Sequence, residues 1–409
     1  MKEVSYMSKF DHYFLMKAED IIEYTLEKMP EIPWDQASIQ TKEIGDGNLN
    51  YVYRVWDGKG HSVIIKHAGE SLRISDQMHV SVDRNRIESE ILQLEDKYAP
   101  GMVPKIYFYD TVMSACGMED LSEYQLMRYA LMEHKTFPKF ADDISTFMVN
   151  TLLMTSDVVM EHKAKKDLVK SFISPELCEI TEDLVLMEPY NDIKHENNVF
   201  PPNAEFVKKE LYSDEVLHLA VSKLKFKFMT NAQALMHGDL HTGSIFVKPD
   251  STKVFDPEFA TYAPMGYDIG NVIANLIFAY DNGLAHGKDE FCAWCLDAIE
   301  KTVDLFVEKF QKKFDQEATE PMAKVKGFKE WYLNDILDDT AGYCGTELHR
   351  RTVGMANVKD VTTIADEGKR AWVERLNILC GKDCILNAGK FRTGKDYVEA
   401  IRKAQEAAK

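Results

Sequence analysis

The spacing of hydrophobic residues divides the chain into two regions with different predicted structures. Short β-type runs separated by Gly-rich turns in the first region predict β-strands at residues 38–44, 50–56, 62–66, 105–109 and 111–118. Helical spacing predicts one helix at 83–96 among these strands and an amphipathic helix at 8–28 before them. These elements predict an antiparallel sheet with a helix on one face.

Beyond residue 121, the apolar residues recur with the period of long amphipathic helices. Only the region 235–262 interrupts this pattern, with short runs that predict hairpins. Exposed connections are expected at 134–142, 190–204 and 313–326. The sequence therefore predicts an α+β protein of two lobes, with an N-lobe at 1–118, a hinge at 119–122 and a helical C-lobe at 123–409.

Composition argues against several classes of function. The chain has 49 Lys and Arg against 67 Asp and Glu, a formal charge of −18, so a phosphate-rich duplex would be repelled and nucleic acid is not expected as a partner. No apolar run approaches the ~20 residues of a membrane span, and the N-terminus lacks the pattern of a signal peptide. A protein without a membrane partner, located in the cytoplasm, is expected.

The seven cysteines agree with a reducing compartment, because they are scattered and odd in number. The pair Cys292 and Cys295 has the spacing of a redox motif, but it lies in a stretch with helical periodicity. Cys380 and Cys384 are likewise spaced as neighbours on a helix. Plain helix packing is the expectation for both pairs.

The most informative motif is HGDLHTGSIF at 237–246, followed by Asp256-Pro257-Glu258. It places one carboxylate, Asp239, on a short loop and two more shortly after it. Phosphoryl transfer needs such a set: one carboxylate to receive or orient the acceptor hydroxyl, and others to hold Mg²⁺ against nucleotide phosphates. The motif favours ATP-dependent phosphorylation of a small molecule.

Other residues of this motif and its surroundings are expected to support the loop or the metal site. His237 is expected to brace the loop, and a structural role is also the favoured interpretation for His241. Ser244 occupies the position at which kinase loops usually carry an asparagine that binds Mg²⁺. Glu258 is expected to compensate for that loss beside Asp256.

A second group of candidates lies among the predicted strands. Gly45, Gly47, Asn48 and Asn50 form a GxGxxN turn whose backbone could approach phosphates, although most glycine turns bind nothing. Lys66 closes an apolar strand. Such a lysine is often only a solvated strand end, but beside a glycine-rich turn it is expected to contact the α- and β-phosphates of ATP.

The predicted helix at 83–96 and the predicted hinge add further candidates. Glu88 is the expected ion-pair partner of Lys66, with Glu90 as the competitor. Backbone groups of Glu119, Asp120 and Leu121 are expected to bind the adenine edge, although these residues are nearly as compatible with a simple turn.

Arg350 and Arg351 lie on a predicted late helix. Adjacent helical residues point ~100° apart, which predicts different roles: one arginine against a buried carboxylate, the other reaching a substrate hydroxyl or a phosphate. Surface solvation is the usual role of such a pair.

Together these motifs resemble the methylthioribose kinase family, which groups with aminoglycoside phosphotransferases and choline kinases of protein-kinase-like fold. The resemblance rests on EIGDGNLNYVYRV (43–55), MEDL (118–121), HGDLHTGSIFV (237–247), DPEFATYAPMGYDIG (256–270) and ELHRRTVG (347–354). It implies phosphorylation of a sugar's anomeric hydroxyl by ATP, and a homodimer. It also implies roles for three groups of residues: nucleotide contacts at Asn50, Lys66, Glu119, Asp120 and Leu121, Mg²⁺ at Asp256 and Glu258, and sugar contacts at Asp239, Arg350 and Arg351.

Two alternatives stay open at this point. The chain could phosphorylate another small alcohol, such as an aminoglycoside, choline, homoserine or a fructosamine. It could also be a nucleotide-binding pseudokinase, because Ser244 and the missing third glycine are changes typical of a decayed enzyme.

Overall fold

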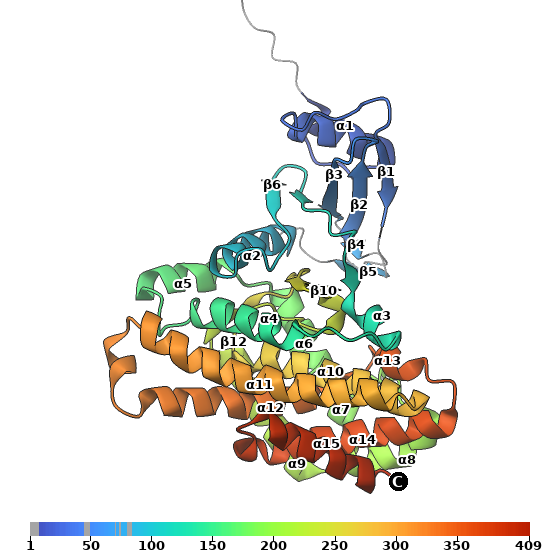
Figure 1. Ribbon diagram of the computed structural model, residues 1–409, viewed down its shortest axis with the longest axis vertical. Helices are drawn as coiled ribbons and strands as arrows, with labels where there is room; N and C mark the ends of the chain where they lie inside the picture. The colour runs from blue at the N-terminus through green and yellow to red at the C-terminus, as the bar shows by residue number, and fades with distance from the viewer. Residues whose placement is uncertain (1–7, 45–49, 70, 73–74, 80–83) are drawn as a thin grey trace, which may run out of the picture. The chain divides into compact units, whose positions relative to one another are not determined.

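The structure is a computed structural model that describes residues 8–44, 50–69, 71–72, 75–79 and 84–409. The chain separates into two compact units, Met1–Glu123 and Tyr124–Lys409 (Figure 1). Each unit has its own buried apolar cluster. The boundary between the two units lies one residue beyond the predicted hinge at 119–122, where the hydrophobic pattern changes.

The first unit contains a five-stranded antiparallel sheet, as predicted, with the strand order β1-β2-β3-β7-β6. The strands are β1 (Gln40–Glu43), β2 (Asn50–Trp56), β3 (Ser62–Ala68), β6 (Ile106–Asp110) and β7 (Ala115–Met118). A small ladder of β4 (Ser71–Leu72) and β5 (Ser75–His79) was not predicted. The predicted strand at 111–118 begins too early, because the Asp110 carboxylate accepts hydrogen bonds from the amides of Val112 and Met113 and holds a turn.

The N-terminal helix is shorter than predicted. A 3₁₀ turn, η1 (Lys9–Asp11), is separated from α1 (Ala18–Lys28) by non-helical backbone. In this stretch the amide of Met16 donates to His67 Nε2 in β3 at 3.3 Å. The single helix expected at 8–28 is therefore wrong, because the segment forms a tertiary hydrogen bond in place of a helical one.

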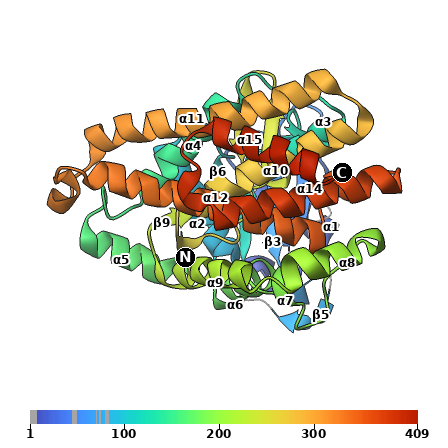
Figure 2. The same ribbon diagram turned by 90° about the horizontal axis from the view of Figure 1, so that it is seen from below.

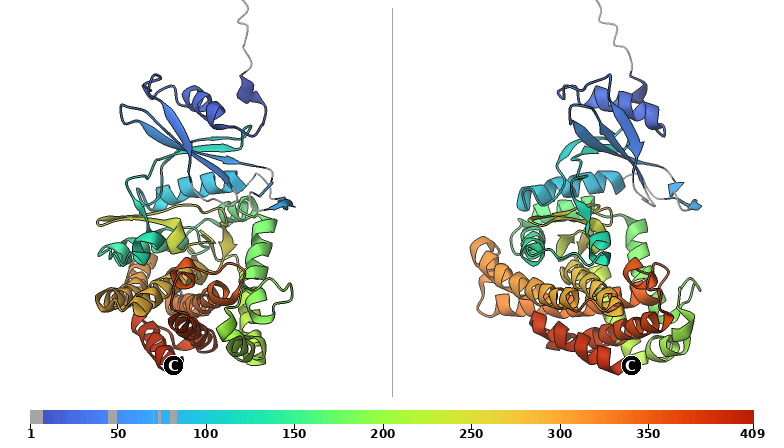
Figure 3. Two further views of the ribbon diagram at one scale, coloured as in Figure 1. Left: turned by 90° about the vertical axis from the view of Figure 1, so that its right-hand side faces the viewer. Right: turned by 45° about the vertical axis from the view of Figure 1, so that its right-hand side comes forward.

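Alternation along β3 places its side chains on opposite faces of the sheet. Val63 and Ile65 join the apolar cluster that also contains Ile21 and Tyr24 of α1. Lys66 points to the other face, where its Nζ lies 2.7 Å from Glu88 of α2 (Arg84–Tyr98). The two helices thus lie on different faces of the sheet (Figure 3).

The second unit is mostly helical. Its α-helices are α3 (Met127–Met132), α4 (Phe140–Met148), α5 (His162–Ser171), α6 (Pro175–Leu184), α7 (Glu188–Asn191), α8 (Ala204–Val207), α9 (Glu215–Thr230), α10 (Gly266–His286), α11 (Asp289–Glu317), α12 (Phe328–Val353), α13 (Lys359–Thr362), α14 (Glu367–Leu386) and α15 (Gly394–Ala407). Two π-helical turns are η2 (Val149–Leu153) and η4 (Lys208–Tyr212), and the 3₁₀ turns are η3 (Pro201–Asn203), η5 (Thr242–Ser244), η6 (Pro321–Lys324) and η7 (Ala388–Lys390).

All three of the expected connections are partly helical. The segment expected at 134–142 already enters α4 at Phe140, and that at 313–326 begins inside α11. The segment expected at 190–204 begins inside α7, where Tyr190 is buried, and ends at the start of α8. Buried Phe140 and Phe314 explain the difference, because each packs an apolar ring that an exposed loop would leave in water. The α+β class itself is confirmed.

Helix α10 forms the centre of the second unit, and nearly all of its residues are buried. It packs against α11 and α12, which run beside it in Figure 2. Glycine permits the close approach to α12: a Cβ on Gly270 would lie 2.5 Å from the amide nitrogen of Cys344. This crossing brings the residues of α10 and α12 that line the candidate site close to one another.

Short strands carry the motif region, as predicted. β9 (Ala234–Met236) pairs with β12 (Thr261–Ala263). β10 (Ile245–Lys248) pairs on one side with β11 (Ser251–Val254) and on the other with β8 (Gln125–Leu126). The loop between β9 and β10 contains the HGDLHTGS motif.

All seven cysteines are free thiols. Cys292 and Cys295 are buried in α11, and Cys380 and Cys384 are buried in α14, which confirms helix packing for both pairs. Among the described residues, no helix combines the length and hydropathy that a membrane crossing requires.

Candidate active site

The loop after β9 is held by a carboxylate of α10. Asp268 is buried and accepts hydrogen bonds from the backbone amides of His237 at 2.7 Å and Gly238 at 3.0 Å. Gly238 has a φ of 85°, and a Cβ there would lie 2.3 Å from the carbonyl oxygen of Phe259. Only glycine fits this turn without strain, and the turn presents the next residue, Asp239.

His237 braces the loop, as expected. Its Nε2 lies 3.0 Å from the carbonyl oxygen of Phe255, and its Nδ1 accepts the amide of Asp239 at 3.3 Å. Because a carbonyl only accepts and an amide only donates, the proton is assigned to Nε2.

The Asp239 carboxylate lies between one imidazole and two guanidinium groups. Its Oδ2 is 3.2 Å from His241 Nε2, and its Oδ1 is 3.2 Å from Arg350 Nη2 and 3.6 Å from Arg351 Nη2. These arginines come from α12, 111 residues away in sequence for the Arg350 contact. The structure therefore brings together the three residues predicted to act on the sugar.

Buried Glu347 holds both arginines. Its Oε2 accepts from Nε of Arg350, and its Oε1 accepts from Nε of Arg351 at 3.2 Å. Both arginines contact Glu347 and both lie near Asp239, so the buried carboxylate does not distinguish them. Their side chains are long enough to converge, although their Cα–Cβ bonds diverge around the helix. Different roles toward a substrate stay a prediction.

His241 does more than pack within the loop. Its Nδ1 accepts the amide of Gly243 at 3.1 Å, so the proton of a neutral ring is assigned to Nε2, which donates to Asp239. Ser244 Oγ also lies 3.1 Å from this Nδ1 and is buried.

Charges around Asp239 outweigh its burial. Desolvation alone would raise the pKa of Asp239, but His241, Arg350 and Arg351 together hold it well below its usual range. Burial lowers the pKa of His241, and Arg128 and Arg351 lower it further against the opposing effect of Asp239. The site therefore contains an ionised carboxylate and a neutral imidazole near neutral pH.

The two predicted metal-binding carboxylates follow β11. Asp256 has a φ of 68°, a conformation that costs energy for a residue other than glycine and often occurs at functional sites. Glu258 is buried two residues later. Their hard oxygen donors fit Mg²⁺, which commonly uses one or two carboxylates together with substrate phosphates. Within the described part of the chain, no cluster of three His, Cys, Asp or Glu side chains forms a metal cage.

In the first unit, the expected ion pair of Lys66 forms with Glu88, and both side chains are buried. Glu90 instead pairs with Arg86 at 2.7 Å. Asn50 is buried at the start of β2. Gly45, Gly47 and Asn48 lie outside the described residues.

The predicted hinge residues have structural contacts. The Glu119 amide donates to the carbonyl oxygen of Lys105 at 2.8 Å. Asp120 Oδ2 is 2.6 Å from Arg54 Nε, which assigns the carboxylate of Asp120 to an ion pair within the unit. Leu121 is buried.

Sequence reasoning missed three residues that shape this site: Asp268, Asn275 and Arg128. Asn275 Nδ2 lies 3.3 Å from Glu347 Oε1, and its Oδ1 accepts from Thr242 and Arg128. The one available signal was the presence of two carboxylates and three asparagines within the otherwise largely apolar α10.

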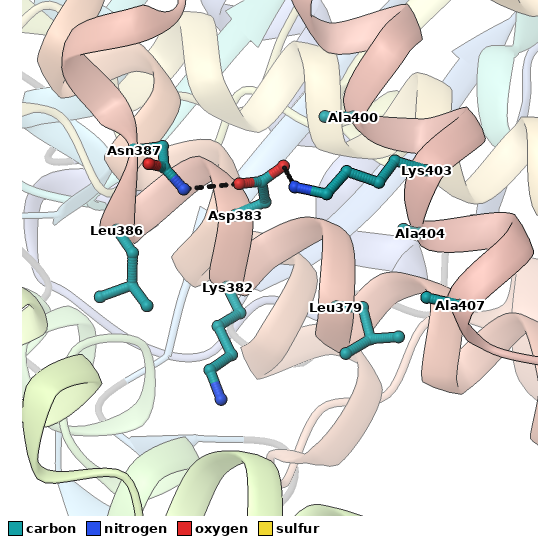
Figure 4. Close-up of a pocket in the computed structure, with 9 residues that line it drawn as sticks. All are labelled: Leu379, Lys382, Asp383, Leu386, Asn387, Ala400, Lys403, Ala404 and Ala407. Atoms are coloured by element: carbon teal, nitrogen blue, oxygen red, sulfur yellow. Dashed lines mark hydrogen bonds and ion pairs between the residues drawn. The ribbon is translucent and has the colours of Figure 1, made fainter.

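A surface pocket between α14 and α15 contains none of the predicted site residues (Figure 4). Asp383, on its wall, contacts Asn387 and Lys403. The lining residues are Leu379, Lys382, Asp383, Leu386, Asn387, Ala400, Lys403, Ala404 and Ala407.

The chain resembles known proteins over most of its length. Residues 208–292 match the model of the phosphotransferase enzyme family. The chain is 40% identical over 356 residues to the methylthioribose kinase of Bacillus cereus strain 03BB102, covering 87% of this chain and 89% of that protein. The methylthioribose kinase of Bacillus thuringiensis strain Al Hakam matches with the same identity and coverage.

Among solved structures, the choline kinase of Cryptosporidium parvum Iowa II is similar, with a TM-score of 0.49 and 13% identity over 87% of this chain and 95% of that one. The sequence relatives are the stronger match, because they retain 40% identity over most of both chains. This chain belongs to the methylthioribose kinase family.

Proposed function

We propose that this small-molecule kinase transfers the γ-phosphoryl group of ATP to the anomeric hydroxyl of S-methyl-5-thioribose. The product would be S-methyl-5-thioribose 1-phosphate, an intermediate of methionine salvage. Support comes from the relatives named methylthioribose kinase and from the phosphotransferase family match. The observation that carries the chemistry is the Asp239 carboxylate held between His241 and two arginines.

Asp239 is suited to orient the acceptor hydroxyl. It is ionised and therefore an acceptor only, so a sugar hydroxyl can donate to it. Its low basicity favours orientation of the hydroxyl over early removal of its proton, which agrees with the loose transition state of phosphoryl transfer.

Arg350 and Arg351 are suited to stabilise the moving phosphoryl group. Both keep Nε on Glu347 and direct Nη2 toward Asp239. Fixed guanidinium donors stabilise negative charge that spreads over phosphoryl oxygens without reorganising during the reaction. Binding of the sugar beside Asp239 would place the reacting oxygen next to these donors.

Asp256 and Glu258 are proposed to bind Mg²⁺ through their carboxylate oxygens. When bound, Mg²⁺ supplies positive charge against the phosphate oxygens of ATP. In the first unit, Lys66, oriented by Glu88, is proposed to contact the α- and β-phosphates, and Asn50 and residues 119–121 are proposed to contact the nucleotide.

The direct test replaces Asp239 by asparagine and follows ADP release with methylthioribose as acceptor. Loss of this carboxylate is expected to lower kcat about 10²- to 10⁴-fold, while binding of ATP is retained. Asp250→Asn is the matched control, because Asp250 lies exposed in the turn of the adjoining hairpin. Near-normal turnover of Asp239→Asn would contradict the assigned role.

A panel of acceptors tests the substrate. Methylthioribose, choline, homoserine, an aminoglycoside and a fructosamine are compared by kcat/KM, and phosphorus NMR identifies the phosphorylated oxygen. Methylthioribose is expected to give the highest value and a 1-phosphate product. ATP-dependent thermal stabilisation without turnover of any acceptor would instead indicate a pseudokinase.

A homodimer located in the cytoplasm completes the proposal. The dimer is what the resemblance to this family implies, and the seven free cysteines support a reducing compartment. Sedimentation equilibrium at several protein concentrations should give twice the chain mass of 46.9 kDa. A single species of chain mass would contradict the dimer.

A further inference from the structure

A third arginine, Arg128, lies beside the loop after β9 that contains Asp239 and His241. Arg128 is the second residue of α3, which follows directly on β8, the strand paired with β10. Its Nη1 is only 3.0 Å from the position that a Cβ on Gly243 would occupy, and the His241 ring lies against the same position. The missing side chain of Gly243 thus leaves room for the guanidinium and the imidazole together.

A buried carboxylate stands behind Arg128. Asp360 in α13 is 1% exposed, and its Oδ2 lies 3.6 Å from Arg128 Nε (α3 and α13 are neighbours in Figure 1). Burial raises the pKa of Asp360, and Arg128 is the largest opposing charge. Burial also raises the pKa of Asp281, a second buried carboxylate, and the nearby Asp360 raises it further. Arg128 therefore stabilises a charge that the surrounding interior disfavours.

On its other side, Arg128 is linked through Asn275 to Glu347, the carboxylate that holds Arg350 and Arg351 (the twin arginines). Its Nη2 donates to Asn275 Oδ1 at 3.3 Å, and Asn275 Nδ2 donates to Glu347 Oε1 at 3.3 Å. Thr242 of the loop also donates to Asn275 Oδ1. Asn275 consequently connects Arg128, the loop and the carboxylate that holds Arg350 and Arg351.

We propose that Arg128, anchored by Asp360, is a positioning residue for phosphoryl transfer. It sets the orientation of Glu347 through Asn275, and it keeps the His241 imidazole as the hydrogen-bond donor to Asp239. The inference deepens the proposed function, since it takes Asp239 as the group that meets the acceptor hydroxyl.

The charges around His241 explain the second role. Asp239 faces the ring from the same loop, Arg128 from α3 and Arg351 from α12. Arg350 contacts Asp239, and Glu347 in turn contacts Arg350. Protonation of His241 would place a second N–H opposite the amide of Gly243, so it would break the turn. The positive charge of Arg128 opposes that protonation.

The alternative is a purely structural ion pair between α3 and α13. A matched pair elsewhere in the same unit separates the two interpretations: Arg370 Nε lies 2.9 Å from Glu374 Oε1, and Glu374 is also buried. Loss of either arginine leaves a buried carboxylate without its cation. Only the loss of Arg128 should change the chemistry.

The experiment compares Arg128→Met, Arg128→Lys and Arg370→Met in the full-length protein. Arg128→Met is expected to lower kcat about 10- to 100-fold, because it releases the groups that orient Asp239 and the twin arginines, with KM for ATP unchanged. The acidic limb of its pH profile should move to higher pH. Arg128→Lys should restore the pH of that acidic limb, because it keeps the positive charge. It should not restore kcat, because the compact ammonium group of lysine cannot contact Asp360 and Asn275 at once as the forked guanidinium does.

NMR titration of the His241 ring supplies a readout that does not depend on activity. The pKa of His241 should rise in Arg128→Met and stay unchanged in Arg370→Met. The inference is overturned if Arg128→Met loses only stability, as Arg370→Met does, with kcat within about twofold of wild type and an unshifted titration. Should Arg128→Met fail to fold, Arg128→Lys decides: a wild-type rate overturns the positioning role. Inactivity of the wild-type protein on methylthioribose would refute only the proposed function, since the titration still tests Arg128.

Discussion

At the residue scale, neighbouring charges decide what each ionisable group of the site can do. Glu347 is completely buried, yet its pKa is lowered, because Arg350 and Arg351 outweigh the effect of desolvation. The same arginines lower the pKa of Asp239. A buried carboxylate that is paired on both oxygens is costly to disturb, since removing its charge leaves two guanidinium groups uncompensated.

Glu347→Gln is expected to lose both stability and activity. Breaking a buried ion pair commonly costs about 3–5 kcal/mol, and the released arginines would pair with Asp239 more tightly, which should lower kcat. Thermal unfolding and steady-state kinetics measure the two effects. Glu374→Gln is the control, because Glu374 is equally buried beside Arg370 and should lose stability alone. A Glu347→Gln enzyme with wild-type kcat would contradict this role.

Glu88 and Glu90 provide a matched pair in the first unit. Glu88 lies 2.7 Å from Lys66, whereas the more exposed Glu90 pairs with Arg86. Glu88→Gln should raise KM for ATP about 10-fold, because Lys66 loses the group that orients it toward the phosphates. Glu90→Gln should leave KM unchanged within error. Equal effects of the two substitutions, measured by initial rates over a range of ATP concentrations, would refute the assignment of Lys66.

At the element scale, the crossing of α10 and α12 builds the candidate site. Gly266 and Gly270 let the two helices approach, since Cβ atoms there would lie 2.4 and 2.5 Å from backbone nitrogens of α12. The same crossing brings Asn275 of α10 to Glu347 of α12. Asp268, on the first turn of α10, holds the loop after β9 through the amides of His237 and Gly238. One packing interface thus determines the positions of both the loop and the twin arginines.

Gly270→Val is expected to destabilise the protein by about 1–3 kcal/mol or more, because the added atoms overlap the backbone of α12. A chemical denaturation midpoint reports the loss, and kcat should fall as Glu347 moves away from Asn275. Gly368→Ala is the control: at this exposed position in α14 the added Cβ meets only a side-chain oxygen of Asp366 at 3.3 Å. It should be neutral or slightly stabilising. Equal denaturation midpoints for the two variants would show that the crossing of α10 and α12 accommodates a larger side chain than the structure allows.

At the scale of the whole molecule, each unit contains a buried neutral histidine. His67 in β3 accepts the amide of Met16, and His349 in α12 lies between Tyr190 and the carbonyl oxygen of Ile378. Burial lowers the pKa of each to about 4 from 6.5. Both units therefore disfavour uptake of a proton that the unfolded chain accepts readily.

Stability is expected to fall on acidification between pH 6.5 and about 4. In this window the unfolded chain binds protons at these histidines and the folded chain does not, so the stability present above pH 6.5 is lost as the pH decreases. Each histidine contributes up to about 1.4 kcal/mol per pH unit. Urea unfolding at pH 7, 6 and 5 should show a shallower dependence for His67→Gln and His349→Gln. An unchanged slope in both variants would be inconsistent with buried neutral rings.

Short runs of β-branched and aromatic residues at β2 and β3, separated by the glycine-containing turn at 57–60, were sufficient to predict the antiparallel sheet, because such runs bounded by turn residues are a local signal for strands. The motif at 237–246, together with Asp256 and Glu258, likewise led to the kinase family without a structure. Local signals failed where a distant partner intervened, as at Met16, whose hydrogen bond to His67 ends a predicted helix.

The sequence by itself determined which chemical groups the protein has and which elements carry them, because periodicity, turn residues and motif spacing are local properties of the chain. Tertiary structure alone decided that Asp239 faces His241 and both arginines, and that Asp268, Asn275 and Arg128 support them. These groups are far apart along the chain and meet only where α3, α10, α12 and the loop pack together. Their charge states follow from that packing, since a pKa depends on burial and on neighbours that the sequence does not identify.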